Sequence, residues 1–132
     1  MSYLIEIPSF NESDGNLGAF EPDIIPGFQI KRVFYIFNVP VGKIRADHAC
    51  MNARMILMVV SGSVRLSIET DSEVKEYYLN NRCTAIVVPE ASWIKAFDFS
   101  SGAVLVGFSD KKYKDCEYID NYNTFKELIR AK

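Results

Sequence analysis

Residues Met55 to Glu69, with the sequence MILMVVSGSVRLSIE, decide the fold. Their first six residues are all apolar and end in two β-branched valines, which is typical of a strand buried on both faces. Ser61-Gly62-Ser63 has the composition of a tight turn. Beyond the turn, Val64, Leu66 and Ile68 alternate with polar residues, and this period of two predicts a strand buried on one face. The stretch therefore predicts two short strands joined by a turn.

Segments of the same kind lie on both sides of this stretch. Arg32 to Asn38 is aromatic and β-branched on both faces, so it also predicts a strand buried on two sides. A polar turn at 70–73 should let the following segment pair back. Only about Asn123 to Ala131 carries apolar residues at helical spacing. Further strands are expected at Val74 to Leu79, Thr84 to Val88, Trp93 to Phe99 and Ala103 to Phe108.

The fold class follows from this run of strands. So many short strands with a single short C-terminal helix predict an all-β antiparallel sandwich or barrel. The length of 132 residues fits one domain covering residues 1–132. A small barrel can enclose one small ligand. We expect its pocket to open between the sheets, with Tyr35, Arg45 and His48 near it.

The cysteines and the N-terminus indicate the compartment. Cys50, Cys83 and Cys116 are an odd number at wide spacing, which argues against a disulfide framework and against a structural zinc site. Residues 1–10 lack the basic start and the long apolar run of a signal peptide. No apolar run approaches the roughly 20 residues that span a bilayer. We therefore expect a cytoplasmic protein with no membrane partner.

The charges are unevenly distributed along the chain. The formal net charge of −2 argues against a nucleic-acid partner. Residues 1–30 contain five acids and no lysine or arginine, whereas residues 31–65 contain six bases and one acid. A basic segment in an acidic protein suits a pocket for a phosphorylated ligand. An uneven scatter of surface charges is the alternative explanation.

The candidate catalytic residues lie between Gly42 and Cys50. His48 is the only histidine, and histidine is the side chain whose ordinary pKa lies near neutrality. Residues two apart on a strand point to the same face, so His48 and Cys50 should both face the barrel interior, with Arg45 near the start of the strand. One imidazole and one thiolate would coordinate a transition metal poorly. No metal or other cofactor is expected.

Several segments carry a resemblance that extends along nearly the whole chain. Gly42, His48 and Cys50 come close to the first cupin motif, in which a glycine is followed after five residues by His-x-His. The further matching segments are Asp14 to Leu17, Lys31 to Phe37, Arg45 to Cys50, Gly62 to Val64, Trp93, Asp98 to Ser100, Ala103 to Val106, Tyr113, Tyr118-Ile119 and Tyr122 to Phe125. Together they resemble the WxcM-like cupins, whose best-known members are the TDP-4-keto-6-deoxyglucose 3,4-ketoisomerases of deoxysugar biosynthesis.

The resemblance implies a fold, a partner and a reaction. The fold is a cupin jelly roll that works without metal, as a homodimer with exchanged N-terminal strands. The ligand is a thymidine-diphosphate 4-keto sugar, whose ketone moves from C4 to C3 through an enediolate. Such chemistry needs a proton shuttle with a pKa near 7 and donors or cations that hold the enediolate charge. It also needs basic side chains for the diphosphate.

The family's functional residues map onto this chain only in part. His48, Arg45 and Tyr35 are retained, and the resemblance implies catalytic roles for them. Cys50 replaces the second histidine, and Ala46 replaces the glycine that usually follows the arginine. The other departures are Asp14, Arg54, Met55 and Asp120.

Four further residues are candidates for ligand binding, three of them with an alternative. Arg54, like Arg45, could bind the diphosphate or be solvated, since arginine suits phosphate geometry. Arg32 is a further candidate for ligand binding. A Cys50 thiolate could replace the missing imidazole, or Cys50 could be a buried apolar filler. Trp93, like Tyr35, could stack on the ligand or belong to the core. The tail tyrosines are expected to pack the C-terminal segment against the barrel.

The leading hypothesis is a nucleotide-sugar 3,4-ketoisomerase, an isomerase in which His48 moves the proton while Tyr35 and Arg45 orient the sugar and stabilise the enediolate. The alternative is a catalytically altered or inactive cupin that binds a nucleotide sugar or a partner enzyme. The missing second histidine favours this alternative.

Overall fold

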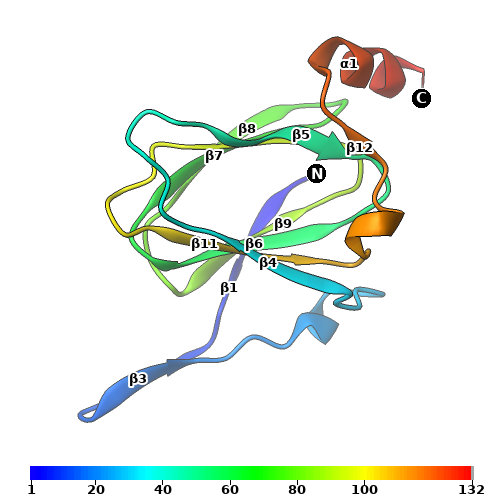
Figure 1. Ribbon diagram of the computed structural model, residues 1–132. Coiled ribbons are helices and arrows are strands. Elements are labelled where there is room, and N and C mark those ends of the chain that lie inside the picture. Colours follow the sequence, from blue (N-terminus) through cyan, green and yellow to red (C-terminus); the bar gives the residue numbers. More distant parts are fainter. Residues whose placement is uncertain (132) are drawn as a thin grey trace.

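Two five-stranded antiparallel sheets face each other and enclose the core, as the computed structural model of residues 1–131 shows (Figure 1). Sheet I contains, in order, β1 (Tyr3–Glu6), β9 (Thr84–Val88), β6 (Met55–Ser61), β11 (Val104–Ser109) and β4 (Arg32–Ile36). Sheet II contains, in order, β12 (Tyr118–Ile119), β5 (Arg45–Cys50), β10 (Ser92–Phe97), β7 (Val64–Glu69) and β8 (Val74–Leu79). The predicted all-β jelly roll with one short C-terminal helix is confirmed.

The decisive stretch carries the chain from one sheet to the other. β6 lies in sheet I and β7 in sheet II, and the predicted turn at 61–63 joins them. Gly62 has a φ of +70°, and a Cβ there would come within 2.5 Å of the Ser100 hydroxyl oxygen. The Ser63 amide donates to that same hydroxyl oxygen at 2.8 Å. Glycine is therefore required at this crossing, both for its backbone angle and for the space.

Burial in β6 and β7 follows the sequence pattern. Leu57 and Val59 of β6 face the core between the sheets, while Ile56 and Met58 face outward. The outward pair is covered by Ile7, Ile25 and Phe28 of the N-terminal segment, which includes the short 3-10 helix Pro22–Ile24. In β7 the alternate positions Val64, Leu66 and Ile68 are fully buried. Both predictions, a strand buried on two faces and one buried on a single face, are confirmed.

The prediction that Arg32 to Asn38 is a strand buried on both faces is wrong for one of the faces. β4 forms the edge of sheet I, and its outward side chains Val33 and Tyr35 are 55% and 64% exposed. Phe37, just beyond the strand, is 54% exposed. Aromatic and β-branched residues on both faces indicated burial, but nothing in residues 1–131 covers this outer face. These three residues form an exposed apolar stripe along the edge.

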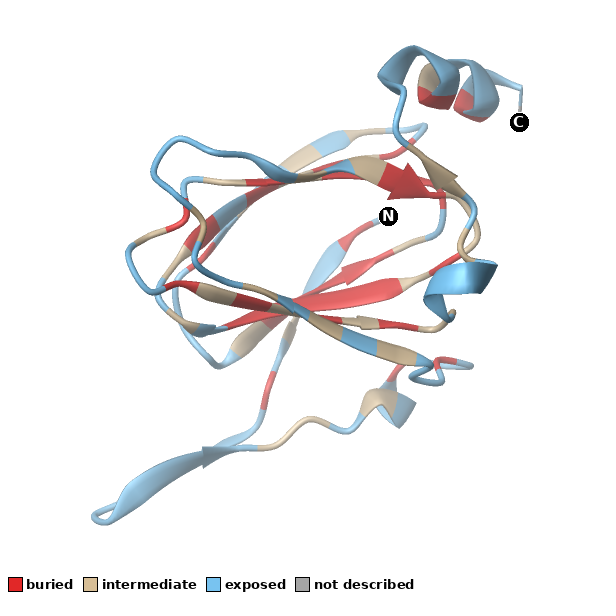
Figure 2. Ribbon diagram, in the orientation of Figure 1, coloured by how far each residue is buried: buried red, intermediate tan, exposed pale blue. Residues whose placement is uncertain are grey.

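The N-terminal residues separate into a paired strand and a projecting hairpin. β1 pairs with β9, whereas β2 (Ser9–Glu12) and β3 (Gly15–Gly18) pair only with each other. All eight residues of this hairpin are exposed (Figure 2). Phe10 and Leu17 face each other across the hairpin and are 55% and 59% exposed.

A bulge interrupts β5 where it pairs with β10. His48 lies opposite Ile94 and Ala46 lies opposite Lys95, so Asp47 is an extra residue without a partner. Ala46 and Asp47 have φ values of +64° and +59°. Left-handed backbone is tolerated by aspartate but is strained for alanine. A bulge bends the strand and redirects the side chains around it.

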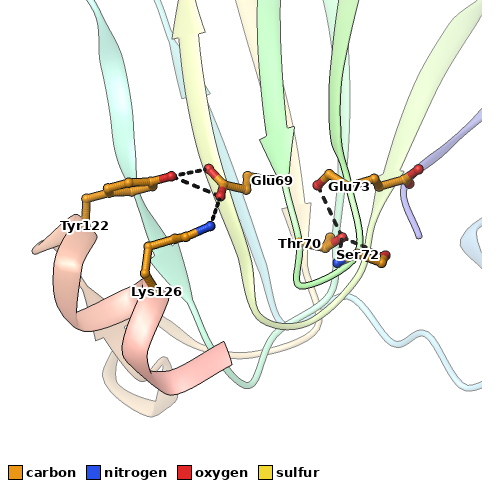
Figure 3. A network of polar contacts seen from close by, with 6 residues as sticks. All are labelled: Glu69, Thr70, Ser72, Glu73, Tyr122 and Lys126. Carbon is orange, nitrogen blue, oxygen red and sulfur yellow. Dashed lines mark hydrogen bonds and ion pairs between the residues drawn. The ribbon is translucent and has the colours of Figure 1, made fainter. Parts of the chain in front are cut away.

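The C-terminal helix α1 (Tyr122–Arg130) packs on one end of the outer face of sheet II (Figure 1). Its start is capped by Asn121, whose side chain accepts from the Thr124 amide. Phe125 and Ile129 pack on Trp93 and Ala49 of the sheet. A polar network also ties the helix to β7 (Figure 3). In that network Tyr122 and Lys126 each donate to the Glu69 carboxylate at 2.8 Å.

Within residues 1–131, no helix combines the length and the apolar character needed to cross a membrane.

Replacing Ala46 with glycine should stabilise the protein. Glycine adopts the left-handed backbone of Ala46 without strain. Removing the strain should raise the free energy of unfolding by about 0.5–1 kcal/mol. Urea denaturation measures this as a higher midpoint at an unchanged slope.

The matched control is Ala49→Gly in the same strand, at a buried position without positive φ. There glycine should lower stability. A loss of stability in Ala46→Gly equal to that of Ala49→Gly would contradict the strain assigned to the bulge.

Candidate active site

A cavity of about 270 Å³ opens between the two sheets. We call it the His48 cavity. Its walls come from β4, β6 and β11 of sheet I and from β5, β10 and β12 of sheet II. The lining residues are Arg32, Phe34, Tyr35, Ile36, Arg45, Ala46, His48, Met55, Leu57, Ile94, Ala96, Leu105 and Tyr118. The structure thus brings Arg32, Tyr35, Arg45 and His48, four of the residues singled out from the sequence, to one apolar-walled cavity.

His48 projects from β5 into this cavity and is half-buried. Its ring contacts the edge of the Tyr118 ring, with centroids 5.0 Å apart. Burial, followed by the positive charge of Arg32, lowers the pKa of His48 below its ordinary value of 6.5, while Asp47 opposes the shift. The imidazole is therefore neutral at neutral pH. A neutral imidazole in a cavity is able to accept a proton from a bound molecule.

Arg32 brings a positive charge to the cavity from the start of β4. Its Nη2 donates to the Tyr118 phenol oxygen at 2.7 Å. Its guanidinium also lies 5.1 Å from the ring centre of Phe34 and 5.5 Å from that of Tyr113. The Nε atom is buried and has no hydrogen-bond partner among residues 1–131. A guanidinium held by aromatic rings at the wall of the cavity can stabilise negative charge on a ligand.

Tyr35 and Arg45 lie at the rim of the cavity. Tyr35 belongs to the exposed face of the edge strand β4, and its ring packs on Phe37 with centroids 5.6 Å apart. Arg45 begins β5 and is exposed. Because the bulge at Asp47 breaks the alternation of β5, Arg45 and His48 line the same cavity although they are three residues apart.

Cys50 lies deeper in the core and does not line the His48 cavity. It is 4% exposed, and its thiol donates to the Asn52 side-chain oxygen at 3.3 Å. Burial, together with the neighbouring Cys116, raises the pKa of Cys50 to about 12. The side chain is therefore a neutral thiol at neutral pH. These contacts favour the buried filler over a thiolate that replaces an imidazole.

Arg54 and Trp93 are not brought to the cavity. The Arg54 guanidinium pairs with Asp110 at 3.3 Å and donates to the Pro26 carbonyl at 3.0 Å. Trp93 is on the outer face of sheet II, beneath α1, because it alternates with Ile94, which faces the cavity. Its indole N–H donates to the Asp47 carboxylate at 3.0 Å. Trp93 thus fixes the bulge from the far side of the sheet and has no place in the cavity.

Tyr118 is the cavity residue that sequence reasoning missed. The tail tyrosines were expected only to pack the C-terminal segment. The two-residue strand β12 pairs with β5, which places Tyr118 opposite Cys50 and beside His48. So short a strand has no periodicity of its own. The sequence signal at this position was the resemblance of Tyr118-Ile119 to the family, and it did not place Tyr118 in the cavity.

No cluster of three or more histidine, cysteine or acidic side chains able to hold a metal ion occurs within the part of the chain that the structure describes.

Comparison with known proteins agrees on one family. The family model described as WxcM-like, C-terminal matches residues 1–130. A TDP-4-oxo-6-deoxy-alpha-D-glucose-3,4-oxoisomerase from Aneurinibacillus thermoaerophilus is 30% identical to the chain, over 96% of the chain and 91% of that protein.

Solved structures of 3,4-ketoisomerases have the same fold along their whole length. One is a mutant of QdtA from Thermoanaerobacterium thermosaccharolyticum in complex with TDP-4-keto-6-deoxyglucose. It is 27% identical, with a TM-score of 0.91 over 99% of this chain and 95% of that one. Another, a 3,4-ketoisomerase from Helicobacter canadensis, is 26% identical, with a TM-score of 0.90 over 98% and 97% of the two chains.

The single histidine permits a direct test of the electrostatics. A proton NMR titration should place the midpoint of the His48 imidazole signal below 6.5. Replacing Arg32 with glutamine removes the charge that opposes protonation, so the midpoint should rise.

The matched control for this titration is Arg65→Gln. Arg65 pairs with Asp98 at 3.6 Å on the outer face of sheet II, so its loss should leave the midpoint unchanged. A wild-type midpoint above 6.5, or equal shifts in the two variants, would contradict the described environment of His48.

Proposed function

The chain belongs to the WxcM-like, C-terminal family, and we propose that it is a 3,4-ketoisomerase acting on a TDP-4-keto-6-deoxyhexose. The observation that carries the proposal is the His48 cavity, in which a neutral imidazole lies beside the guanidinium-bound phenol of Tyr118. The relatives that share this fold along the whole chain are TDP-sugar 3,4-ketoisomerases. The reaction belongs to deoxysugar biosynthesis.

His48 would move the carbon-bound proton. The neutral imidazole takes the proton from C3 of the sugar, and the electron pair of that bond forms a C3–C4 double bond as charge moves to the C4 oxygen. The same imidazole then protonates C4 of the enediolate while a proton passes from the C3 hydroxyl to the C4 oxygen, and the ketone is then at C3. A positioned histidine contributes typically about 10²–10⁴-fold to the rate of such a step.

The cationic side chains would hold the negative charges of substrate and intermediate. Arg32 lines the cavity, and the positive charge of its guanidinium would stabilise the enediolate oxygen there. Tyr35 and Arg45, at the rim, would orient the sugar and contact the diphosphate, since arginine matches phosphate geometry.

The size of the cavity fits a sugar inside the cavity and a diphosphate at its rim. Its volume of about 270 Å³ is below the roughly 300–1,000 Å³ of pockets that enclose drug-sized ligands. A single sugar ring therefore suits the interior, while the thymidine diphosphate would extend beyond the rim.

A homodimer with exchanged N-terminal strands forms part of the proposal. The β2–β3 hairpin leaves Phe10 and Leu17 exposed, and the stripe of Val33, Tyr35 and Phe37 leaves the outer face of β4 uncovered. Exposed apolar surface of this kind marks interaction sites. A second copy of the chain would cover both surfaces at once.

Sedimentation equilibrium should therefore give twice the 15.0 kDa mass of one chain. Removing the apolar contacts in a Phe10→Ser, Leu17→Ser variant should shift the mass toward that of a single chain. A wild-type protein that sediments as a monomer at micromolar concentration would contradict the dimer.

Cys50 supports a second candidate function. Where the family's motif has its second histidine, this chain has a buried neutral thiol that moves no proton at neutral pH. This one observation favours a cupin that binds the nucleotide sugar without converting it.

Steady-state conversion of TDP-4-keto-6-deoxyglucose to its 3-keto isomer separates the two candidates. The wild type should form product, and His48→Asn should lower kcat by at least about 10²-fold, because asparagine cannot shuttle the proton. Cys83→Ala, at an exposed cysteine far from the cavity, should retain the wild-type rate.

A wild type that binds the sugar nucleotide without forming product would contradict the ketoisomerase. If the wild type is inactive in this way and Cys50→His gains activity, the protein is the second candidate, a cupin that binds the nucleotide sugar without converting it.

A further inference from the structure

Within residues 1–131, the hydroxyl proton of Tyr118 has no strong acceptor. Arg32 donates to the phenol oxygen at 2.7 Å, and a guanidinium has only donors, so the phenol must direct its own proton elsewhere. The neighbouring thiol of Cys116 is a weak acceptor. Because Tyr118 lines the His48 cavity, the proton is available to a molecule bound there.

Tyr118 and His48 flank the same part of the cavity. Tyr118 projects from β12 and lies opposite Cys50 of β5 in the strand register. The rings of Tyr118 and His48 meet edge to face, with centroids 5.0 Å apart. A sugar carbon that contacts the imidazole would therefore bring its attached oxygens close to the phenol.

Ketone migration requires a second proton transfer, besides the one between the carbons. The starting sugar has a hydroxyl on C3 and a carbonyl on C4, and the product has the reverse. Besides the proton that passes from C3 to C4, a proton must pass from O3 to O4. While His48 holds the proton from C3 it cannot also carry this second proton. Tyr118 is the phenol that lies against His48, whereas Tyr35 is on the exposed face of β4 and the thiol of Cys50 is outside the cavity.

We infer that Tyr118 is the catalytic residue that moves the oxygen-bound proton, an inference that rests on the proposed function. As His48 removes the C3 proton and the C3–C4 double bond forms, the Tyr118 phenol gives its proton to O4, which yields the enediol and a phenolate. The phenolate then takes the proton of the O3 hydroxyl. The C3 carbonyl forms as C4 receives the proton held by His48, and both side chains return to their starting states.

The surroundings of Tyr118 suit this exchange. Burial raises the pKa of the phenol, so Tyr118 holds its proton at neutral pH and can act as the acid. The charge of Arg32 opposes that rise and would stabilise the transient phenolate. The titratable groups that lie against the phenol are His48, Arg32, Tyr113 and Cys116.

The test is Tyr118→Phe in the full-length protein, assayed with TDP-4-keto-6-deoxyglucose. The variant keeps the ring that packs on His48 and loses only the hydroxyl. We expect kcat to fall by about 10²-fold, the usual contribution of a positioned acid–base group. The dissociation constant for TDP, measured by calorimetry, should stay at the wild-type value. The decline of kcat at high pH, where the phenol loses its proton, should disappear.

The matched control is Tyr113→Phe. Tyr113 packs on Tyr118 at 5.3 Å and on Arg32 at 5.5 Å, but it does not line the cavity. This variant should keep the wild-type kcat and the wild-type pH profile.

Three results would overturn the inference. The first is a kcat in Tyr118→Phe equal to that of the wild type, and the second is a loss of TDP affinity as large as the loss of kcat. In both cases an active wild type leaves the proposed function standing. The third is a wild type that does not convert the sugar, which overturns the proposed function and this inference together.

Discussion

The bulge in β5 is the constraint on which the candidate site depends. An extra residue, Asp47, together with the left-handed backbone of Ala46, breaks the alternation of the strand. Without it, Arg45 and His48, three residues apart, would point to opposite faces of sheet II. The indole of Trp93 anchors the bulge through its hydrogen bond to Asp47, and α1 covers that indole. The C-terminal helix thus stabilises, from outside the barrel, the backbone that orients the cavity.

The cavity concentrates a few polar groups in an apolar setting. Leu57, Ile94 and Leu105 are apolar residues of its wall. His48, Arg32 and Tyr118 are the polar side chains that line its interior. Fixed charges and donors act more strongly in such surroundings than in water, because the local dielectric constant is lower. The same surroundings keep the imidazole neutral and the phenol protonated. One base and one acid therefore meet at a single cavity, although the chain has only one histidine.

The sequence predicted much of the fold and part of the site, for identifiable reasons. The alternation in β7 and the apolar run of β6 reflect which side chains are buried. A fold built from such strands could therefore be predicted from the sequence. The resemblance to a family led to His48, Arg45 and Tyr35, which do line one cavity. Sequence pattern could not show that β4 is an edge strand, because the residues of an uncovered face can be as apolar as those of a covered one. It could not place Tyr118 or exclude Trp93 from the cavity, because the pairing of β12 and the docking of α1 are set by tertiary contacts.

The most direct test of the central claim, that His48 exchanges a proton with C3 of the sugar in this cavity, is an NMR measurement in deuterated water. TDP-4-keto-6-deoxyglucose is incubated with the wild type and with His48→Asn, and the C3 and C4 proton signals are followed. With the wild type we expect the C3 signal to disappear, because the imidazole takes that proton and delivers it, or a deuteron exchanged for it, to C4. With the variant we expect the C3 signal to persist. Persistence of the C3 proton in sugar that is bound by the wild type would contradict it.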